Sequence, residues 1–165
     1  MMTEADRLFC ERYNGADGGR RSTMLATYPF MSEISSRLHE AALSGTNGTK
    51  MTILSGHDTV IGPVLASLDV YKNGCTWPPY ASRIVFELWQ QRAKDSAQTK
   101  ESYISASSSF VRVIYNGRDV SGDIPRCQTA AASGGLCPLA ALKAQVDDML
   151  GGAAGLKEAC ARGGL

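Results

Sequence analysis

The chain has 165 residues, a length that suits one domain and allows a substantial hydrophobic core. Its residues are 44% hydrophobic and 20% charged, which excludes a wholly disordered chain. The 17 basic and 16 acidic residues give a formal net charge of +1, and no dense basic cluster points to nucleic-acid binding. No apolar run approaches the ~18 to 20 residues that a membrane-spanning helix needs.

The start of the chain differs in character from the rest. Residues 1–7 are acidic and polar, with no basic or apolar region of the kind a signal peptide has. The body nevertheless carries five cysteines and the N-glycosylation pattern Asn47-Gly48-Thr49, which are typical of the secretory pathway. We therefore expect Asn47 to be a glycosylation site and a further segment to precede Met1 in the natural protein.

Two helices are expected in the first part of the chain. The first covers residues 3–13, where Thr3 can cap the helix and Asp6 follows three residues later. The second covers 22–43, and Pro29 is expected to kink it or to split it. Apolar residues of this second segment share one face because they are spaced by three and four: Met31, Ile34, Leu38 and Ala42.

A buried strand is predicted over residues 50–55, followed by a helix over 59–68. Pro63 fits that helix only in its first turn. The junction between strand and helix carries Gly56-His57-Asp58. Because ligands bind at the carboxyl ends of strands in open α/β sheets, and helix N-termini favour anions, this junction is a candidate site.

The second half of the chain predicts strands and one further helix. Residues 82–89 and 110–115 alternate as an antiparallel pair would, and Asn116-Gly117 is a hairpin signal. Pro138 opens a helix that Gly151-Gly152 ends, and 151–165 is expected to be a weakly structured tail. One face of this helix carries four apolar residues: Leu139, Leu142, Val146 and Met149.

The cysteines and the remaining polar and aromatic residues favour structural roles. Cys127 and Cys137 are expected to form a local disulfide, which we favour over a metal pair because no zinc-ligand spacing is present. Cys10, Cys75 and Cys160 leave an odd count, so one partner lies outside the chain or one thiol is free. His39 is expected to be an ordinary helix residue. We assign Phe86, Trp89 and Tyr115 to the core, and expect Arg83 and Arg112 to be exposed or paired.

Several short runs follow one another in a fixed order: Ser55-Gly56-His57-Asp58-Thr59, Pro78-Pro79-Tyr80-Ala81-Ser82-Arg83, Phe86-Glu87-Leu88-Trp89, residues 111–120 and Cys137-Pro138-Leu139. Together they resemble the histidine acid phosphatases, the acid phosphatase and phytase branch of the histidine phosphatase superfamily. The resemblance covers roughly residues 50–142. The run from Gly56 looks closest to 2-phosphoxylose phosphatases, whereas residues 78–82 are more like lysosomal-type acid phosphatases, so the substrate branch stays open.

The resemblance implies an α/β fold, of which this chain is the C-terminal part, 1–165, of a single histidine phosphatase domain. It implies phosphomonoester hydrolysis through a phosphohistidine, in which His57 binds the phosphoryl oxygens and Asp58 donates a proton to the leaving oxygen. Gly56 and Thr59 are the associated substrate-binding residues. A phosphomonoester such as a phosphorylated sugar is the expected substrate, in a lysosomal, Golgi or extracellular setting, with no cofactor, metal or nucleic acid.

The family's nucleophile motif, Arg-His-Gly-x-Arg-x-Pro, does not occur in this sequence. His39 cannot replace it, because it stands in Arg37-Leu38-His39-Glu40 within a predicted helix. We therefore expect little phosphatase activity from this chain alone. A non-catalytic pseudo-phosphatase or binding module is the alternative, and a weaker one is pairing with a separate chain that supplies the missing motif.

Overall fold

The structure is a computed structural model that describes residues 3–15, 19–44, 48–73, 75–90, 109–128 and 135–161. Short 3-10 turns occur at Val70–Asn73, Ser121–Asp123 and Met149–Gly151. The helices and strands follow in this order: α1 (Glu4–Asn14), α2 (Gly19–Ser44), α3 (Asp58–Ser67), β1 (Ile84–Gln90), β2 (Ser109–Tyr115), β3 (Arg118–Asp119), α4 (Pro125–Gln128), β4 (Cys137–Pro138), α5 (Leu139–Asp147) and α6 (Gly152–Ala161).

The sheet is built around the predicted antiparallel pair. β1 and β2 pair from Ile84 opposite Tyr115 to Gln90 opposite Ser109, while β3 and β4 both pair with β2. Asn116 and Gly117 connect β2 to β3 with φ values of 48° and 86°. A two-residue hairpin turn needs positive φ at both positions, so the prediction of a hairpin from Asn-Gly is confirmed.

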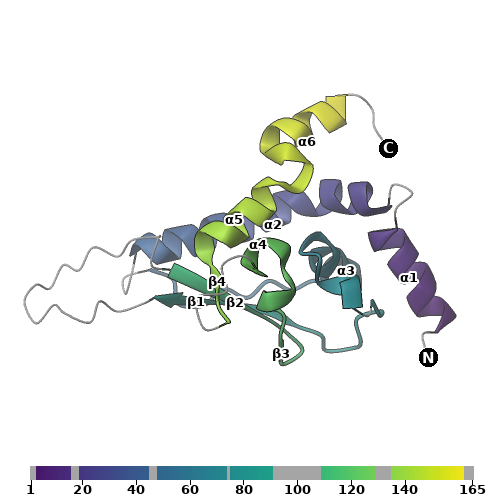
Figure 1. Cartoon of the computed structure of the whole chain (residues 1–165), viewed down its shortest axis with the longest axis horizontal. Helices are drawn as coiled ribbons and strands as arrows, with labels where there is room; N and C mark the ends of the chain where they lie inside the picture. The colour runs from purple at the N-terminus through teal and green to yellow at the C-terminus, as the bar shows by residue number, and fades with distance from the viewer. Residues whose placement is uncertain are drawn as a thin grey trace, which may run out of the picture.

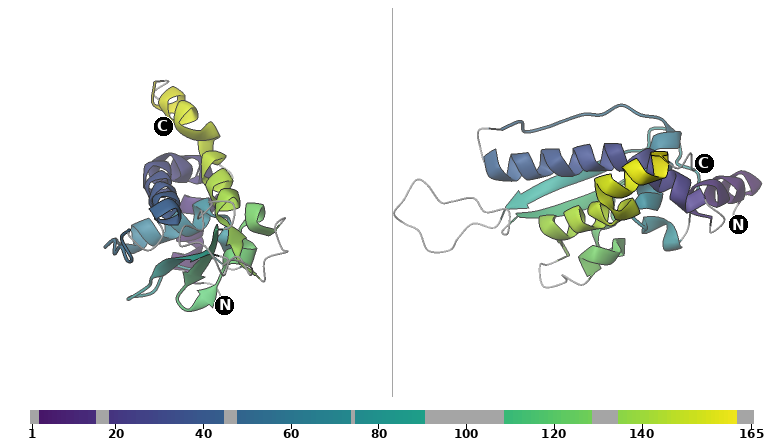
Figure 2. Two further views of the ribbon diagram at one scale, coloured as in Figure 1. Left: turned by 90° about the vertical axis from the view of Figure 1, so that its left-hand side faces the viewer. Right: turned by 90° about the horizontal axis from the view of Figure 1, so that it is seen from above.

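Helices α2 and α5 lie side by side over one face of this sheet (Figures 1 and 2). The predicted apolar face of α2 is confirmed, since Met31 and Ala42 are buried and Ile34 and Leu38 pack against the core. The predicted face of α5 is confirmed as well. Its four residues, Leu139, Leu142, Val146 and Met149, are all buried in the same core as Val111 and Val113 of β2.

Two prolines lie inside helices without ending them. Helix α2 is continuous from Gly19 to Ser44, so the possibility that Pro29 splits it was wrong. Pro29 is exposed and cannot donate a backbone hydrogen bond. The buried side chains of Tyr28 and Met31, on either side of it, pack against the core and hold the helix together at this point. Pro63 is the sixth residue of α3 instead of lying in its first turn, and the buried residues around it hold that helix in the same way.

Helix α1 begins with the predicted cap. The Thr3 hydroxyl accepts from the Asp6 N–H at 3.1 Å, and the Asp6 carboxylate accepts from the Thr3 N–H at 3.0 Å. This capping box satisfies two backbone donors that the helix itself leaves free. The helix over 3–13 is therefore confirmed within one residue at each end.

The buried strand predicted over residues 50–55 was wrong. Residues 51–57 have no regular secondary structure, and Met51, Ile53 and Leu54 are exposed, Ile53 by 78%. The segment runs back from the end of α2 to the start of α3 (Figure 2, right). No strand among the described residues pairs with it, and an apolar run forms a strand only where a neighbouring strand takes its backbone hydrogen bonds.

The end of the chain also differs from the expectation. The segment 151–165, predicted to be a weakly structured tail, contains helix α6 over Gly152–Ala161. Alanine has the highest helix propensity, and four alanines lie within these ten residues. Gly151 and Gly152 both have positive φ and turn the chain between α5 and α6, where the break was expected.

The cysteines form two disulfides, Cys10–Cys75 and Cys127–Cys137. The predicted local pairing is therefore confirmed, and the fifth cysteine, the exposed Cys160, is free. No helix within the described ranges is both long and apolar enough to cross a membrane.

The aromatic residues assigned to the core have mixed outcomes. Phe86 and Tyr115 pack against it, but Trp89 is 45% exposed because it lies on the other face of β1. Its ring packs under the Arg112 guanidinium, 4.9 Å from the ring centroid, while Arg112 also faces Glu87 and Asp119. The expectation for Arg112 as a paired charge is confirmed, and Arg83 is exposed.

Candidate functional site

The motif Gly56-His57-Asp58-Thr59 spans the beginning of α3. His57 is the residue before the first helical turn, with an extended backbone, and its carbonyl accepts from the N–H groups of Val60 at 2.9 Å and Ile61 at 3.1 Å. Its imidazole makes no capping hydrogen bond, and the residue is exposed. The backbone of His57 is thus fixed by the helix, while its side chain stays accessible.

Asp58 is the first residue of α3 and is half-buried. One carboxylate oxygen, Oδ1, accepts from the backbone N–H of Thr59 at 2.8 Å. The other, Oδ2, accepts from the indole N–H of Trp77, which lies 19 residues further along the chain. Both oxygens therefore accept a hydrogen bond, so the orientation of this carboxyl group is defined.

Trp77 is itself held from helix α1. Its backbone N–H donates to Oδ1 of Asp6 at 2.9 Å, and its ring stacks on Phe9 with 5.0 Å between ring centroids. The bonds from the Thr3 hydroxyl and from the Trp77 and Thr3 N–H groups hold the pKa of Asp6 below its usual range. The Cys10–Cys75 disulfide joins the same helix to the chain two residues before Trp77.

Helix α1 packs directly against α3. Phe9 is buried, and its ring lies so close to Gly62 that a Cβ at that glycine would be 2.3 Å from Cζ of Phe9. The absence of a side chain at Gly62 is what lets the two helices approach. The candidate site is therefore formed where α3, α1 and the segment around Trp77 meet.

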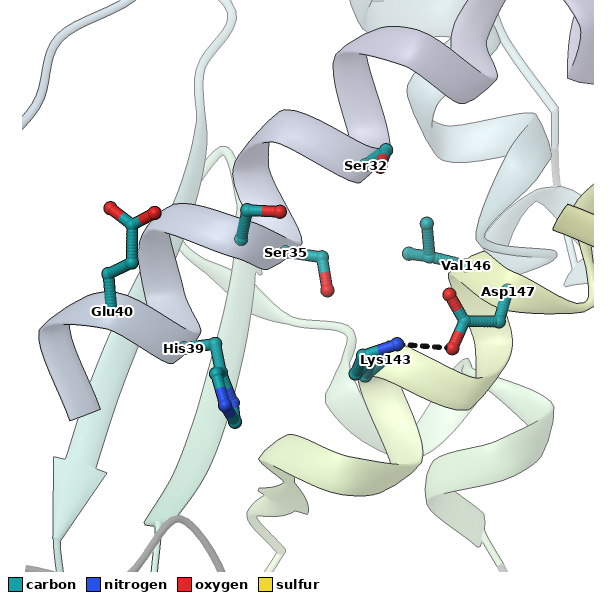
Figure 3. Close-up of a pocket in the computed structure, with 8 residues that line it drawn as sticks. Ser32, Ser35, His39, Glu40, Lys143, Val146 and Asp147 are labelled. Carbon is teal, nitrogen blue, oxygen red and sulfur yellow. Dashed lines mark hydrogen bonds and ion pairs between the residues drawn. The ribbon is translucent and has the colours of Figure 1, made fainter. Parts of the chain in front are cut away.

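His39 lies elsewhere. It is a half-buried residue of α2 and lines a shallow hollow of about 200 Å³ between α2 and α5, together with Ser35, Lys143 and Asp147 (Figure 3). Lys143 is paired with Asp147 across one turn of α5, and the hollow shares no residue with the motif at α3. This agrees with the expectation that His39 is an ordinary helix residue.

A comparison with protein families shows which family the chain belongs to. The family described as the histidine phosphatase superfamily (branch 2) matches residues 9–116. The chain belongs to this superfamily. The match includes the Gly-His-Asp motif and Trp77, and ends at the hairpin residue Asn116. Within the residues described, the mixed arrangement of helices and antiparallel strands is consistent with the α/β histidine phosphatase fold.

Several individual relatives of the chain are named as phosphatases. The chain is 32% identical over 133 residues to 2-phosphoxylose phosphatase 1 of Danio rerio, which covers 73% of this chain and 24% of the relative. It is 27% identical over 123 residues to lysophosphatidic acid phosphatase type 6 of Bos taurus, with 73% and 24% covered. It is also similar to counting factor 60 of Dictyostelium discoideum, 37% identical over 89 residues, with 54% and 17% covered.

These matches leave most of each relative uncovered. The chain spans about a quarter of the length of the Danio rerio and Bos taurus relatives. No solved structure matches the chain with statistical significance. The resemblance found in the sequence is confirmed at the level of the family, while the roles of His57, Asp58, Gly56 and Thr59 stay predictions. Asn47, the expected glycosylation site, lies outside the described residues.

One residue of the site, Trp77, was not identified from the sequence. No role for Trp77 was predicted, and its contacts with Asp58, Asp6 and Phe9 were not expected. Cys75 two residues earlier was the one available signal, since pairing with Cys10 would bring this loop to α1. That pairing was among several left open.

Proposed function

We propose that the protein carrying this chain hydrolyses phosphomonoesters through a phosphohistidine intermediate. The observation that supports this is the Gly-His-Asp motif at the start of α3, with its carboxyl group held by two donors, in a member of the histidine phosphatase superfamily. This chain would be the C-terminal part of the domain and would supply His57 and Asp58. The nucleophilic histidine would come from residues outside this sequence, since it contains no Arg-His-Gly.

His57 is suited to bind the transferring phosphoryl group. It is exposed at the N-terminal end of a ten-residue helix, where the helix dipole favours negative charge. The phosphoryl group carries negative charge on its oxygens throughout the transfer, and imidazole N–H groups are suitable donors to them. Gly56 and Thr59, on either side of this pair, would line the same phosphate-binding position.

Asp58 is suited to donate the proton that the leaving oxygen needs. When the P–O bond breaks, its electron pair goes to the ester oxygen, and the proton passes from the Asp58 carboxyl group to that oxygen. The carboxylate that remains is stabilised by the hydrogen bonds from Thr59 and Trp77. Proton donation matters most for esters whose alkoxide is a poor leaving group.

A phosphorylated sugar is the substrate we favour, because the relative from Danio rerio is named a 2-phosphoxylose phosphatase. We further propose that the protein works in the secretory pathway. Two disulfides among the described residues support this, since disulfides persist in oxidising compartments.

The test replaces His57 with alanine in the full-length natural protein, with His39→Ala as the matched control on another helix. We expect His57→Ala to lower kcat/KM for every phosphomonoester by about 100-fold or more, and to weaken inhibition by inorganic phosphate. The His39→Ala control should retain the parent's kcat/KM and its inhibition by inorganic phosphate. A His57→Ala protein with unchanged turnover would remove this residue from the site.

The same assay distinguishes phosphomonoester hydrolysis from the alternative function, that of a pseudo-phosphatase that binds phosphate but hydrolyses no ester. The absence of Arg-His-Gly from this sequence is the observation that favours it. Inorganic phosphate that binds in a His57-dependent way, with no turnover of p-nitrophenyl phosphate by the unsubstituted protein, would establish this second function in place of the first.

A further inference from the structure

We propose that Trp77 is a positioning residue for the Asp58 carboxyl group and that helix α1 holds it in place. The proposal rests on the function proposed above, because it assigns Trp77 a part in proton donation by Asp58. It concerns a residue outside the Gly-His-Asp motif, on a segment that no regular secondary structure fixes.

The side chain of Trp77 is exposed but firmly held. Trp77 is 44% exposed, yet its indole N–H, its ring and its backbone N–H each have a partner. The partners of the ring and backbone, Phe9 and Asp6, both belong to α1. The Cys10–Cys75 disulfide adds a covalent link to the same helix. Such a side chain has little freedom to turn its indole N–H away from Asp58.

The contact has a direct chemical consequence. An N–H donor at Oδ2 fixes the plane of the carboxyl group and stabilises the negative charge that grows on it as its proton leaves. The Thr59 N–H alone cannot fix the plane of the carboxyl group, because it bonds only to Oδ1 and leaves Oδ2 without a donor. Trp77 therefore acts through Asp58, and its contribution is largest where proton donation limits the rate.

The test uses Trp77→Phe in the full-length natural protein, which keeps an aromatic ring to stack on Phe9 but removes the indole N–H. We expect kcat for an alkyl phosphate to fall about tenfold, and kcat for p-nitrophenyl phosphate, a good leaving group, to fall less than about twofold. The matched control is Trp89→Phe. Trp89 is 45% exposed and donates its indole N–H to Glu87 at 3.1 Å, so it differs from Trp77 mainly in place.

A second measurement reads the contact without any activity. In a ¹H–¹⁵N spectrum of the indole groups, the Trp77 signal, assigned by its loss in Trp77→Phe, should shift in Asp58→Ala, while the Trp89 signal should not. An unmoved Trp77 signal would overturn the proposal, as would equal losses of kcat for both esters in Trp77→Phe. If the unsubstituted protein turns over no ester, the proposed function fails and the assignment of Trp77 fails with it. An active protein whose Trp77→Phe variant keeps the parent's rates overturns the assignment alone.

Discussion

At the scale of single residues, the hydroxyl groups of Tyr71 and Tyr115 are buried and have no hydrogen-bond partner among the residues that the structure describes. Tyr71 is only 6% exposed, and burial, followed by the nearby Tyr115, raises its pKa well above the usual value. A buried hydroxyl without a partner costs about 1 to 3 kcal/mol. Tyr71 therefore contributes its ring to the packing around Phe9 and Leu65 but loses free energy through its oxygen.

We expect Tyr71→Phe to be as stable as the parent, or more stable, at neutral pH and to lose less stability in alkali. Because burial raises the folded-state pKa of Tyr71, this group does not alter the parent's stability with pH below the unfolded pKa of about 10. Above that pH the parent's stability falls, because the hydroxyl ionises in the unfolded chain but not in the folded one. Urea unfolding at pH 8 and pH 10.5 measures both effects. If Tyr71→Phe lost as much stability as the parent between pH 8 and pH 10.5, the raised pKa of Tyr71 would be contradicted.

At the scale of elements, the contact between α1 and α3 organises the site. Phe9 occupies the space that Gly62 leaves open, and Trp77 stacks on the same ring. The positions of Phe9 in α1 and Asp58 in α3 are thus linked through one close approach of two helices. A side chain at Gly62 would push α1 away from α3 and take Trp77 with it.

Gly62→Ala should lower the free energy of unfolding by about 1 to 2 kcal/mol, because overpacking costs more than alanine's helix propensity returns. Gly122→Ala is the control, since a Cβ there meets nothing within 4 Å, and we expect a change within about 0.5 kcal/mol. Chemical denaturation of both variants measures the difference. Equal effects would mean that the Phe9 contact is not tight. Adding Phe9→Leu should relieve part of the loss.

At the scale of the whole molecule, two helices cover one face of the sheet, and the motif lies at one end, where α1 meets α3 (Figure 1). The sequence predicted what depends on near neighbours. The Thr3 capping box, the spacing of Met31 and Leu142 on their helices and the Asn116-Gly117 turn are all local patterns, and each is confirmed. The family also followed from short runs in a fixed order.

The remainder depends on partners far away in the chain. Residues 50–55 have the apolar composition of a strand, but a strand forms only where another strand pairs with it, and composition does not reveal that partner. The contacts of Trp77 with Asp58 and Asp6 span 19 and 71 residues. They exist because α1 packs on α3, and no local pattern near Trp77 encodes that packing.

The most direct test of proton donation by Asp58 is the dependence of rate on leaving group in the full-length natural protein with Asp58→Asn. The measurement is kcat/KM for a series of phosphomonoesters, from alkyl phosphates to p-nitrophenyl phosphate. We expect a loss of about 100-fold or more for the alkyl esters and a much smaller one for p-nitrophenyl phosphate, because a good leaving group needs no proton. The same fractional loss across the whole series would contradict the assignment of Asp58 as the proton donor.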